Sequence, residues 1–586
     1  MRLAVSRLIG FLLVVLAVIL LVAVALPFDS LELLFNRLTF DHDFGLLRPE
    51  NWTVFRVSFL TLSLLLAAQG GWLLLWPDRF TRTMHAFQPR VAWKQIVDTL
   101  RTDSPQGWYL VIFLSIFVLA FYFRIEQLNM PLIHDEAYTV TAFASNSFLQ
   151  AISDYHLPNN HILNTIMVFV STRLFGIAPW AVHIPAFFAG LILVLGVYFL
   201  GCRIYDQKTA LLAMLLVALS PAVVELSTSA RGYILVMMFT VLTAWLADLV
   251  SREKNILAWV LLSVFTALGF YAVPVFMFPF GMVFAWLLME AMLTGAKGYK
   301  SRREFLFHYV LAGLGAAFLT LALYFPVFVF TGPAAVFSNG FVKPLPYSLL
   351  EWRLPMYAEK TWSYWTQRVP DILVTILVVS FIVGLLLHWR VARQKVPMLF
   401  AAAIWIGTVI LVRRPDPWAR LWHFLLLFFL FVASAGIMGL LRMFDARLRW
   451  RVSFASITLV VSLVLAVIYC LTTIPYFAQT WATTCSAERA TLFMKPRLQE
   501  NDLVIAGRPH RSVLEYYFRL YGVPASHWEK TDTTDRVWVV VYSRKEQTLE
   551  RFLSMRQLDP EKYNSETMEL LEEYDDALVL FLGPKE

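Results

Sequence analysis

Apolar stretches of about 20 residues recur along most of this 586-residue chain. Each stretch is long enough to cross the hydrocarbon core of a bilayer, which is about 30 Å thick. The stretches are continuously apolar and do not alternate with polar residues, so they predict helices and not the strands of a membrane barrel. Only 15% of the residues are charged, whereas soluble domains are about 25% charged. We therefore predict an α-helical polytopic membrane protein.

The apolar stretches predict thirteen membrane spans. The spans are 8–26, 55–76, 108–123, 181–200, 209–226, 233–250, 257–272, 274–292, 306–330, 371–388, 397–412, 421–441 and 453–472. Arg2 and Arg7 precede the first span, and every loop that would then lie on the same side carries at least two basic residues. Because cytoplasmic loops are enriched in Lys and Arg, we expect a cytoplasmic N-terminus and an extracytoplasmic C-terminus. The composition favours a bacterial inner membrane, whereas the outer-side sequon "NWT" at Asn51 would be usable in a protein of the endoplasmic reticulum. Orientation accounts for the net charge of +8, so we expect membrane lipids and no nucleic acid as partners.

Three regions follow from this pattern. Residues 1–104 hold two N-terminal spans and a cytoplasmic linker, 105–472 form the main membrane module, and 473–586 form the tail. The first large outer loop, 124–180, contains an apolar stretch at 161–176 that would reverse the side of every later basic loop if it crossed the membrane. We therefore expect it to be a helix in the outer interface, with "HDEAYTVTAFASNSFLQAI" as a second such helix.

The tail differs from the rest of the chain because its apolar runs are short. "DLVIAG", "VWVVVYS" and "ALVLFLG" are typical of buried strands, and "HRSVLEYYFRLYG" and "KEQTLERFLSMRQ" between them are typical of helices. This β-α-β-α-β order predicts a small extracytoplasmic α/β domain. It has no Gly-rich phosphate loop, so we do not expect it to bind a nucleotide.

Titratable residues open the outer segment "IHDEAYTVTA", which begins with His134, Asp135 and Glu136 after its first isoleucine. Two adjacent carboxylates at a membrane edge are costly unless they are solvated, paired or functional. Asp135 could act as a general base toward an acceptor hydroxyl. The alternative is that Asp135 caps a helix and Glu136 only solvates the loop.

A second polar cluster on the same loop contains Asp154, His156 and His161. Together with His134, these side chains are candidates for contacts with a substrate or a metal. Their spacing is not a strong metal signature, and histidines in loops are more often simply hydrogen-bonded. We therefore predict no metal and no required cofactor, although a divalent ion is possible.

Basic residues on the outer side are fewer and call for a reason. They are Arg231, Lys343, Arg353, Lys360, Arg413, Arg414 and Arg420. The candidate ligands of an anion are Arg231 with its neighbour Tyr233, Lys343, Arg353 and Arg420. Each could snorkel to lipid headgroups. Together they indicate an anionic ligand, and guanidinium groups suit phosphate because they donate hydrogen bonds in a fork.

The order of these segments resembles the GT-C membrane glycosyltransferases. The segments are "HDEAYT", "LPNNHILNTIMVFVSTRLFGIAPWAVHIPAFFAGL" and "RIYDQKTALLAMLLVALSPAVVELSTSARGYILVMMF", and they follow an apolar span. The resemblance covers about 105–275 and is closest to the branch of protein mannosyltransferases and lipid A aminoarabinose transferases. It implies a polyprenyl-phosphate-linked sugar donor that is used outside the cytoplasm.

The resemblance also implies roles for particular residues. An acidic residue of the first outer loop is the family's catalytic base, which matches Asp135 and makes Glu136 a supporting acid. Where family members often carry "HPP", this chain has "NNH" at 159–161, so the family assigns no role there. "SARGY" keeps the arginine and tyrosine of a family segment in Arg231 and Tyr233, and "ARLW" keeps only the arginine of another in Arg420.

We therefore expect a glycosyltransferase that moves a sugar to an acceptor hydroxyl with inversion. The acceptor could be a glycolipid, a polysaccharide or a protein. A transporter or lipid flippase is the main alternative, but ionisable residues gather on one outer face and not within the spans, and no internal repeat is evident. A non-catalytic membrane scaffold is the third possibility.

Overall fold

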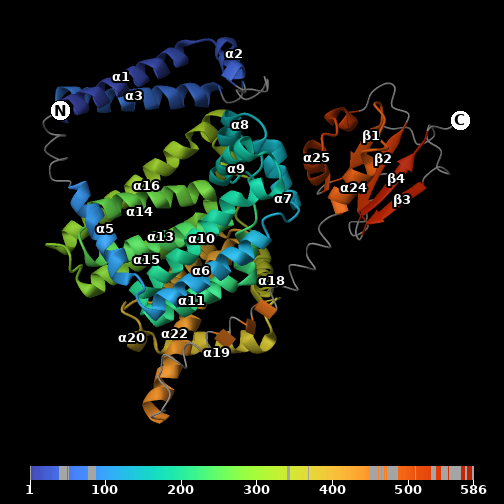
Figure 1. Cartoon of the computed structure of the whole chain (residues 1–586). Coiled ribbons are helices and arrows are strands. Elements are labelled where there is room, and N and C mark those ends of the chain that lie inside the picture. The colour runs from blue at the N-terminus through green and yellow to red at the C-terminus, as the bar shows by residue number, and fades with distance from the viewer. Residues whose placement is uncertain are drawn as a thin grey trace.

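The computed structural model describes most of the chain. The described residues are 2–38, 52–76, 88–339, 343–366, 368–448, 486–507, 510–529, 536–542, 569–574 and 577–583, with Pro49, Phe552 and a few positions between 460 and 471. Helices form the bulk of the molecule, and a small sheet lies in the C-terminal domain (Figure 1). The predicted fold class is confirmed.

Eight helices within the described residues are long and apolar enough to cross a membrane. They are α1 (Arg2–Ala25), α3 (Trp52–Leu75), α6 (Trp108–Glu126), α10 (Pro179–Ile204), α13 (Tyr233–Arg252), α15 (Met277–Thr294), α16 (Arg302–Phe330) and α22 (His423–Leu448). Helices α13 and α15 run side by side through the main body, and α1 pairs with α3 along one flank (Figure 1). The protein is an integral membrane protein.

The predicted number of thirteen spans is not confirmed. Four apolar helices are shorter, namely α9 (Ile162–Phe175), α11 (Gln207–Leu219), α14 (Ile256–Ala272) and α21 (Met398–Arg413). Helices α18 (Tyr347–Thr366) and α19 (Asp371–Leu386) meet at a bend of 114° and could form one broken span. Most of the predicted span 453–472 lies outside the described residues.

The predicted span 209–226 is interrupted by a proline. Helix α11 ends at Leu219, and Pro221 begins α12 (Pro221–Leu226), because proline has no N–H and its ring clashes with the preceding helical turn. The buried Arg124 donates from Nη1 to the Ala218 carbonyl at 3.0 Å, where a cation stabilises the helix end. The chain then turns through 227–232, which contains Arg231, before α13 begins.

The outer loop between α6 and α10 is helical but more broken than expected. The single helix expected from "HDEAYTVTAFASNSFLQAI" is wrong, because this segment forms α7 (His134–Tyr138), the π-helical turn η2 (Thr139–Ala144) and α8 (Phe148–Ser153). Ser147 caps the start of α8, since its hydroxyl accepts a hydrogen bond from the Gln150 amide at 3.1 Å. The helix expected over 161–176 is present as α9.

Several helices occur where the sequence predicted loops. They are α2 (Phe28–Leu38), α5 (Pro89–Asp103), α17 (Ala334–Phe337), α18, α20 (His388–Val391) and the 3-10 turn η4 (Ala419–Trp422). Helix α5 buries Ala92 and Ile96, and the buried Asn255 donates to the Ala92 carbonyl at 2.9 Å. The linker predicted at the end of residues 1–104 is therefore attached to the bundle.

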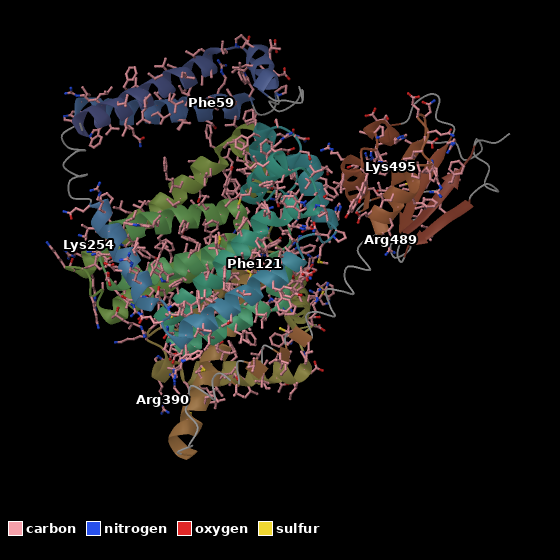
Figure 2. All side chains as sticks on the ribbon, viewed as in Figure 1. Phe59, Phe121, Lys254, Arg390, Arg489 and Lys495 are labelled. Carbon is pink, nitrogen blue, oxygen red and sulfur yellow. The ribbon has the colours of Figure 1, made fainter. Side chains whose placement is uncertain are left out.

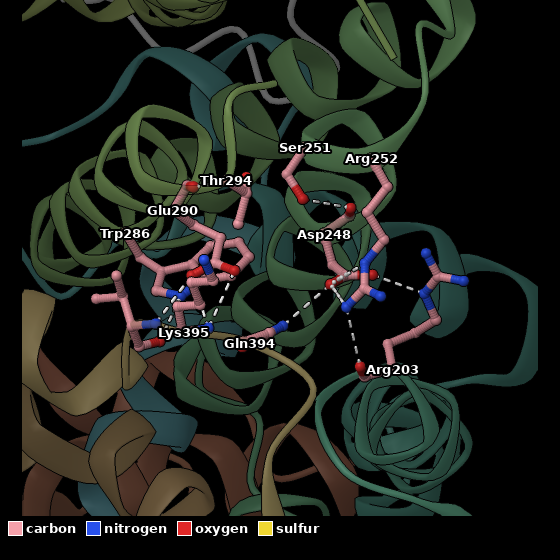
Figure 3. Close-up of polar contacts among 10 residues, drawn as sticks. Arg203, Asp248, Ser251, Arg252, Trp286, Glu290, Thr294, Gln394 and Lys395 are labelled. Atoms are coloured by element: carbon pink, nitrogen blue, oxygen red, sulfur yellow. Dashed lines mark hydrogen bonds and ion pairs between the residues drawn. The ribbon is translucent and has the colours of Figure 1, made fainter. Parts of the chain in front are cut away.

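One end of the bundle is held by buried polar contacts (Figure 3). The Asp248 carboxylate, which is fully buried, accepts hydrogen bonds from Arg203, Arg252 and Gln394 at 2.6–3.1 Å. Glu290 accepts two backbone amides of the 392–397 loop. Arg203 and Arg252 lie in the last turns of α10 and α13, and Gln394 lies in the loop after α20. The basic residues predict that all three positions are cytoplasmic, and the structure brings them together at one end of the bundle.

The C-terminal domain contains a four-stranded sheet of order β1-β2-β4-β3. The strands are β1 (Leu503–Ala506), β2 (Val537–Tyr542), β3 (Glu569–Tyr574) and β4 (Ala577–Leu582), and the helical elements are α24 (Ser486–Met494), α25 (His510–Leu520) and η5 (Ala525–Trp528). Strands β1 and β2 are parallel, whereas β4 is antiparallel to both of its neighbours. The three predicted strands are present. The edge strand β3 was missed because its sequence, "ELLEEY", is acidic and not apolar, and the helix expected at 545–557 lies outside the described residues apart from Phe552.

The C-terminal domain packs on the outer loop through α25, which lies against α7 (Figure 1). Tyr516 donates a hydrogen bond from its hydroxyl to the Ile177 carbonyl at 2.6 Å. Tyr516, Ala137 and Val140 belong to one buried apolar cluster. In Figure 2, Arg489 and Lys495 of this domain lie at the opposite side of the molecule from Lys254 and Arg390 of the predicted cytoplasmic loops.

Candidate functional site

Asp135 lies in the first turn of α7, where the chain enters the outer loop. Its Oδ2 atom is 3.1 Å from Nη1 of Arg231 and 3.6 Å from Nη1 of Arg420. The Asp135 side chain is 37% exposed, so the carboxylate remains open to an incoming molecule. The fold thus brings one carboxylate and two guanidinium groups together from three distant segments. All three residues were candidates from the sequence.

Asn159 connects the two sides of this cluster. Its Oδ1 atom accepts a hydrogen bond from Nη1 of Arg231, and its Nδ2 atom donates to the Asp135 carbonyl at 3.2 Å. The sequence offered "NNH" only as a departure from the family pattern, so it gave no signal for this bridge. The polar bridge holds Arg231, which is only 5% exposed, against α7.

Glu136 points away from Asp135 and into the protein. One of its oxygens accepts the Ala230 amide at 2.7 Å, and the other accepts the Ile133 amide at 2.9 Å and lies 3.7 Å from Nε2 of His183. Burial raises the pKa of Glu136, but the charge and hydrogen bonding of His183 and the Ile133 amide outweigh burial and lower it. Glu136 therefore joins the start of α7 to the turn that carries Arg231. Its predicted supporting role can act only by positioning Asp135 and Arg231 and through the electric field of its charge.

Aromatic rings line the site beyond Arg231. The Tyr233 ring lies 5.1 Å from the His161 ring and 6.1 Å from the His423 ring, and Cζ of Arg231 lies 5.8 Å from the Tyr233 ring centroid. The Tyr364 ring lies 4.7 Å from the His423 ring, so His161, Tyr233, His423 and Tyr364 form a continuous aromatic row. His423 and Tyr364 were not predicted, because single aromatic residues at the ends of apolar segments are too common to be a signal.

His161 is buried and already hydrogen-bonded. Its Nδ1 atom accepts the Gly232 amide at 2.8 Å. Burial lowers the pKa of His161 well below its ordinary value, and the charges of Arg231 and Arg420 act in the same direction. A neutral His161 therefore supports the turn that carries Arg231.

The remaining predicted phosphate ligands lie outside this cluster. Arg353 pairs with Asp416, and Lys343 is exposed. Neither forms an ion pair with Asp135 in the part of the chain that the structure describes. Arg420 lies over the Trp418 ring at 5.1 Å, which holds its guanidinium near Asp135.

A groove of about 450 Å³ lies on one face of α18. It is lined by Met356, Glu359, Lys360, Ser363 and Tyr364. Tyr364 lines this groove and also contacts His423 of the aromatic row. The groove is therefore adjacent to the aromatic row.

Asp154 and His156 lie together beside α7, on the same loop as Asn159. Oδ1 of Asp154 is 2.6 Å from Nδ1 of His156, and Nε2 of His156 is 2.7 Å from the Tyr138 hydroxyl. The His134 ring is 6.2 Å from the Tyr138 ring. Across the described residues, no three His, Cys, Asp or Glu side chains are grouped as they would be to hold a metal ion.

A family model described as dolichyl-phosphate-mannose-protein mannosyltransferase matches residues 163–295. The chain is also similar to the crystal structure of ArnT from Cupriavidus metallidurans in the apo state, with 11% identity and a TM-score of 0.50 over 81% of this chain and 97% of that chain. The structure of the same ArnT bound to undecaprenyl phosphate gives 12% identity and a TM-score of 0.51 over 82% of this chain and 98% of that chain. No curated protein matches the sequence. Residues 163–295 are therefore similar to this mannosyltransferase family, and the chain shares the fold of ArnT.

Proposed function

We propose that the protein transfers a sugar from a polyprenyl-phosphate-linked donor to an acceptor hydroxyl on the extracytoplasmic side of a bacterial inner membrane, with inversion at the anomeric carbon. The observation that carries this proposal is the open Asp135 carboxylate between Arg231 and Arg420. The similar ArnT structure with undecaprenyl phosphate supports the choice of a polyprenyl phosphate, and the basic loops support the orientation.

Each group of the cluster has a place in the reaction. The acceptor oxygen attacks the anomeric carbon from the face opposite the phosphate, and its proton passes to the Asp135 carboxylate. The bond from the anomeric carbon to the phosphate oxygen breaks, and the polyprenyl phosphate leaves with the electron pair. Arg231 and Arg420 stabilise the negative charge that grows on that oxygen.

The two ion pairs of Asp135 suggest how the donor prepares the base. Arg231 and Arg420 both contact Asp135, and a phosphate offers guanidinium groups more acceptor oxygens than one carboxylate. A bound donor phosphate would draw both arginines toward itself and leave Asp135 free to accept the proton. We restrict the phosphate role to these two residues, because Arg353 is paired with Asp416.

The first test is Asp135→Asn, with release of undecaprenyl phosphate from an undecaprenyl-phosphate-linked sugar as the measurement. Asparagine keeps the size of the side chain and can still cap a helix. We expect a folded protein whose turnover is reduced on the order of 10²–10⁴-fold, the usual contribution of a general base. Thermal melting in parallel separates lost chemistry from lost folding.

Asp371→Asn is the matched control. Asp371 also lies in the first turn of an outer-side helix, α19, but it is not in the cluster, so its variant should keep normal turnover. A stable Asp135→Asn protein with the turnover of the wild type would return Asp135 to the role of a helix cap.

The second test is Arg231→Ala, measured as donor use by the same assay. Loss of a charge-assisted hydrogen bond costs roughly 1.5–3 kcal/mol, or about 10–150-fold in binding or transition-state stabilisation. Arg353→Ala, which breaks the pair with Asp416, is the control and should affect donor use less. Unimpaired donor use in both variants would leave Arg231 only a structural role, in which it holds α7 through Asp135 and Asn159.

A further inference from the structure

A hydrogen-bonded row of three side chains lies next to the proposed base. It runs from Asp154 through His156 to Tyr138, with distances of 2.6 Å and 2.7 Å. The two rings also pack against Phe143, whose centroid lies 5.4 Å from the His156 ring and 5.7 Å from the Tyr138 ring. The proposed reaction does not use this row.

The chemistry of the three groups sets the direction of the hydrogen bonds. An ionised carboxylate only accepts, so Nδ1 of His156 donates to Asp154. In the neutral ring Nε2 is then an acceptor, and the Tyr138 hydroxyl donates to it. The backbone amide of His156 donates to the same Asp154 oxygen at 3.0 Å, which fixes the carboxylate. Because a phenolic oxygen can accept a hydrogen bond while it donates one, Tyr138 can present an acceptor oxygen to a ligand.

Tyr138 lies one turn of helix from the proposed base. It follows Asp135 by three residues in α7, and residues at this spacing have Cβ atoms about 5–6 Å apart on one helix surface. The loop that holds Asp154 and His156 also supplies Asn159, which binds the Asp135 carbonyl. One short loop therefore positions both a base and, one turn away, a hydrogen-bond acceptor.

We propose that Tyr138, oriented by His156 and Asp154, accepts a hydrogen bond from a second hydroxyl of the acceptor, so that the acceptor is a saccharide. This inference rests on the proposed function of Asp135. An acceptor that offers one hydroxyl to Asp135 and another, one helix turn away, to Tyr138 carries several hydroxyls on one rigid frame, as a sugar ring does. A serine or threonine side chain of a protein offers one.

The test compares two soluble probes that share a six-carbon alkyl chain, hexyl β-D-glucoside and 1-hexanol. Their Kd values are measured by calorimetry on the full-length protein in nanodiscs with undecaprenyl phosphate present, and empty nanodiscs correct for partition into lipid. We expect the wild type to bind the glucoside more tightly than the alcohol. Tyr138→Phe should weaken glucoside binding about 3–10-fold, as for one lost neutral hydrogen bond, and leave hexanol binding unchanged.

Variants of His156 test whether Tyr138 acts through its partner. The side-chain oxygen of His156→Gln can still accept from the tyrosine hydroxyl, so this variant should keep most of the preference for the glucoside. His156→Phe keeps a ring but has no acceptor and should lose the preference. Tyr122→Phe, which changes an exposed tyrosine of α6, is the control and should bind both probes as the wild type does.

The inference is overturned if the wild type does not prefer the glucoside, or if Tyr138→Phe weakens both probes equally. Donor turnover is measured separately and distinguishes the two proposals. Normal turnover in Asp135→Asn would remove the proposed function, whereas normal glucoside preference in Tyr138→Phe would remove only the role of Tyr138.

Discussion

Asp135 and Glu136 are adjacent carboxylates that the fold places in opposite environments. Asp135 is 37% exposed and faces two arginines, whereas Glu136 is 3% exposed and faces two backbone amides and His183. Successive residues of a helix point about 100° apart, so one carboxylate of the pair can face the site while the other faces the interior. The two residues therefore predict different outcomes on mutation.

Glu136→Gln should destabilise the protein more than it impairs chemistry. Both Glu136 oxygens accept backbone amides, and a glutamine would turn one of them into an amide that cannot accept. An unsatisfied buried group of this kind costs about 1–3 kcal/mol. Thermal melting should show the loss, and turnover of the folded fraction should fall much less than in Asp135→Asn. A fully stable but inactive Glu136→Gln protein would instead make Glu136 a catalytic acid.

The same residue predicts a dependence of stability on pH. The pKa of Glu136 is lowered in the folded protein from its ordinary value of 4.5. Its contribution to stability is therefore fully present above pH 4.5 and is lost as the pH falls below that value through the folded pKa. Melting temperatures measured from pH 7 to pH 3 should show a smaller acid-dependent decrease in Glu136→Gln than in the wild type.

At the scale of elements, the site depends on two places where a helix is broken. Pro221 ends α11 before the turn that carries Arg231, and the outer-loop helix breaks so that 154–161 can return to α7. Helix α25 of the C-terminal domain then packs on the other side of α7. The domain therefore supports the helix that holds Asp135, which is a role that the sequence did not reveal.

Tyr516→Phe tests this support. The change removes the hydrogen bond from α25 to the Ile177 carbonyl but keeps the ring in the apolar cluster. We expect faster hydrogen exchange of the amides of 134–144, by about 3–10-fold for the loss of one hydrogen bond. Tyr309→Phe, which removes a hydroxyl bound to the Phe284 carbonyl within the membrane module, should leave exchange in 134–144 unchanged. Unchanged exchange in Tyr516→Phe would mean that α25 does not stabilise α7.

At the scale of the whole molecule, charge is divided between two ends. Arg203, Arg252 and Gln394 meet around Asp248 at one end (Figure 3), and Asp135 and the C-terminal domain lie at the other. Helices that cross a bilayer keep their basic loops in the cytoplasm. We infer that Asp135 and the C-terminal domain share the extracytoplasmic side.

Cysteine labelling tests this arrangement in a variant that lacks Cys202, Cys470 and Cys485. A cysteine at Lys495, which is exposed on the C-terminal domain, should react with a membrane-impermeant maleimide added to spheroplasts. A cysteine at Lys254, in a predicted cytoplasmic loop, should react only after the membrane is opened. Labelling of both positions, or of Lys254 alone, would contradict the predicted orientation.

The sequence by itself determined the features that depend on local pattern. Continuous apolar runs predicted a helical membrane protein, short apolar runs predicted three of the four strands, and the order of motifs selected Asp135, Arg231 and Arg420. Each of these signals comes from neighbouring residues or from one short motif, so it can be read along the chain.

Only the tertiary structure decided which of these residues meet. Arg231 and Arg420 reach Asp135, whereas Arg353 pairs with Asp416 and Lys343 lies apart. Glu136 turns inward, Asn159 bridges Asp135 and Arg231, and Tyr138 joins His156 and Asp154. These contacts join residues that are far apart in the chain or depend on the direction of single side chains. They are set by how the helices pack against one another, and the hydrophobic periodicity of a single helix does not determine that packing.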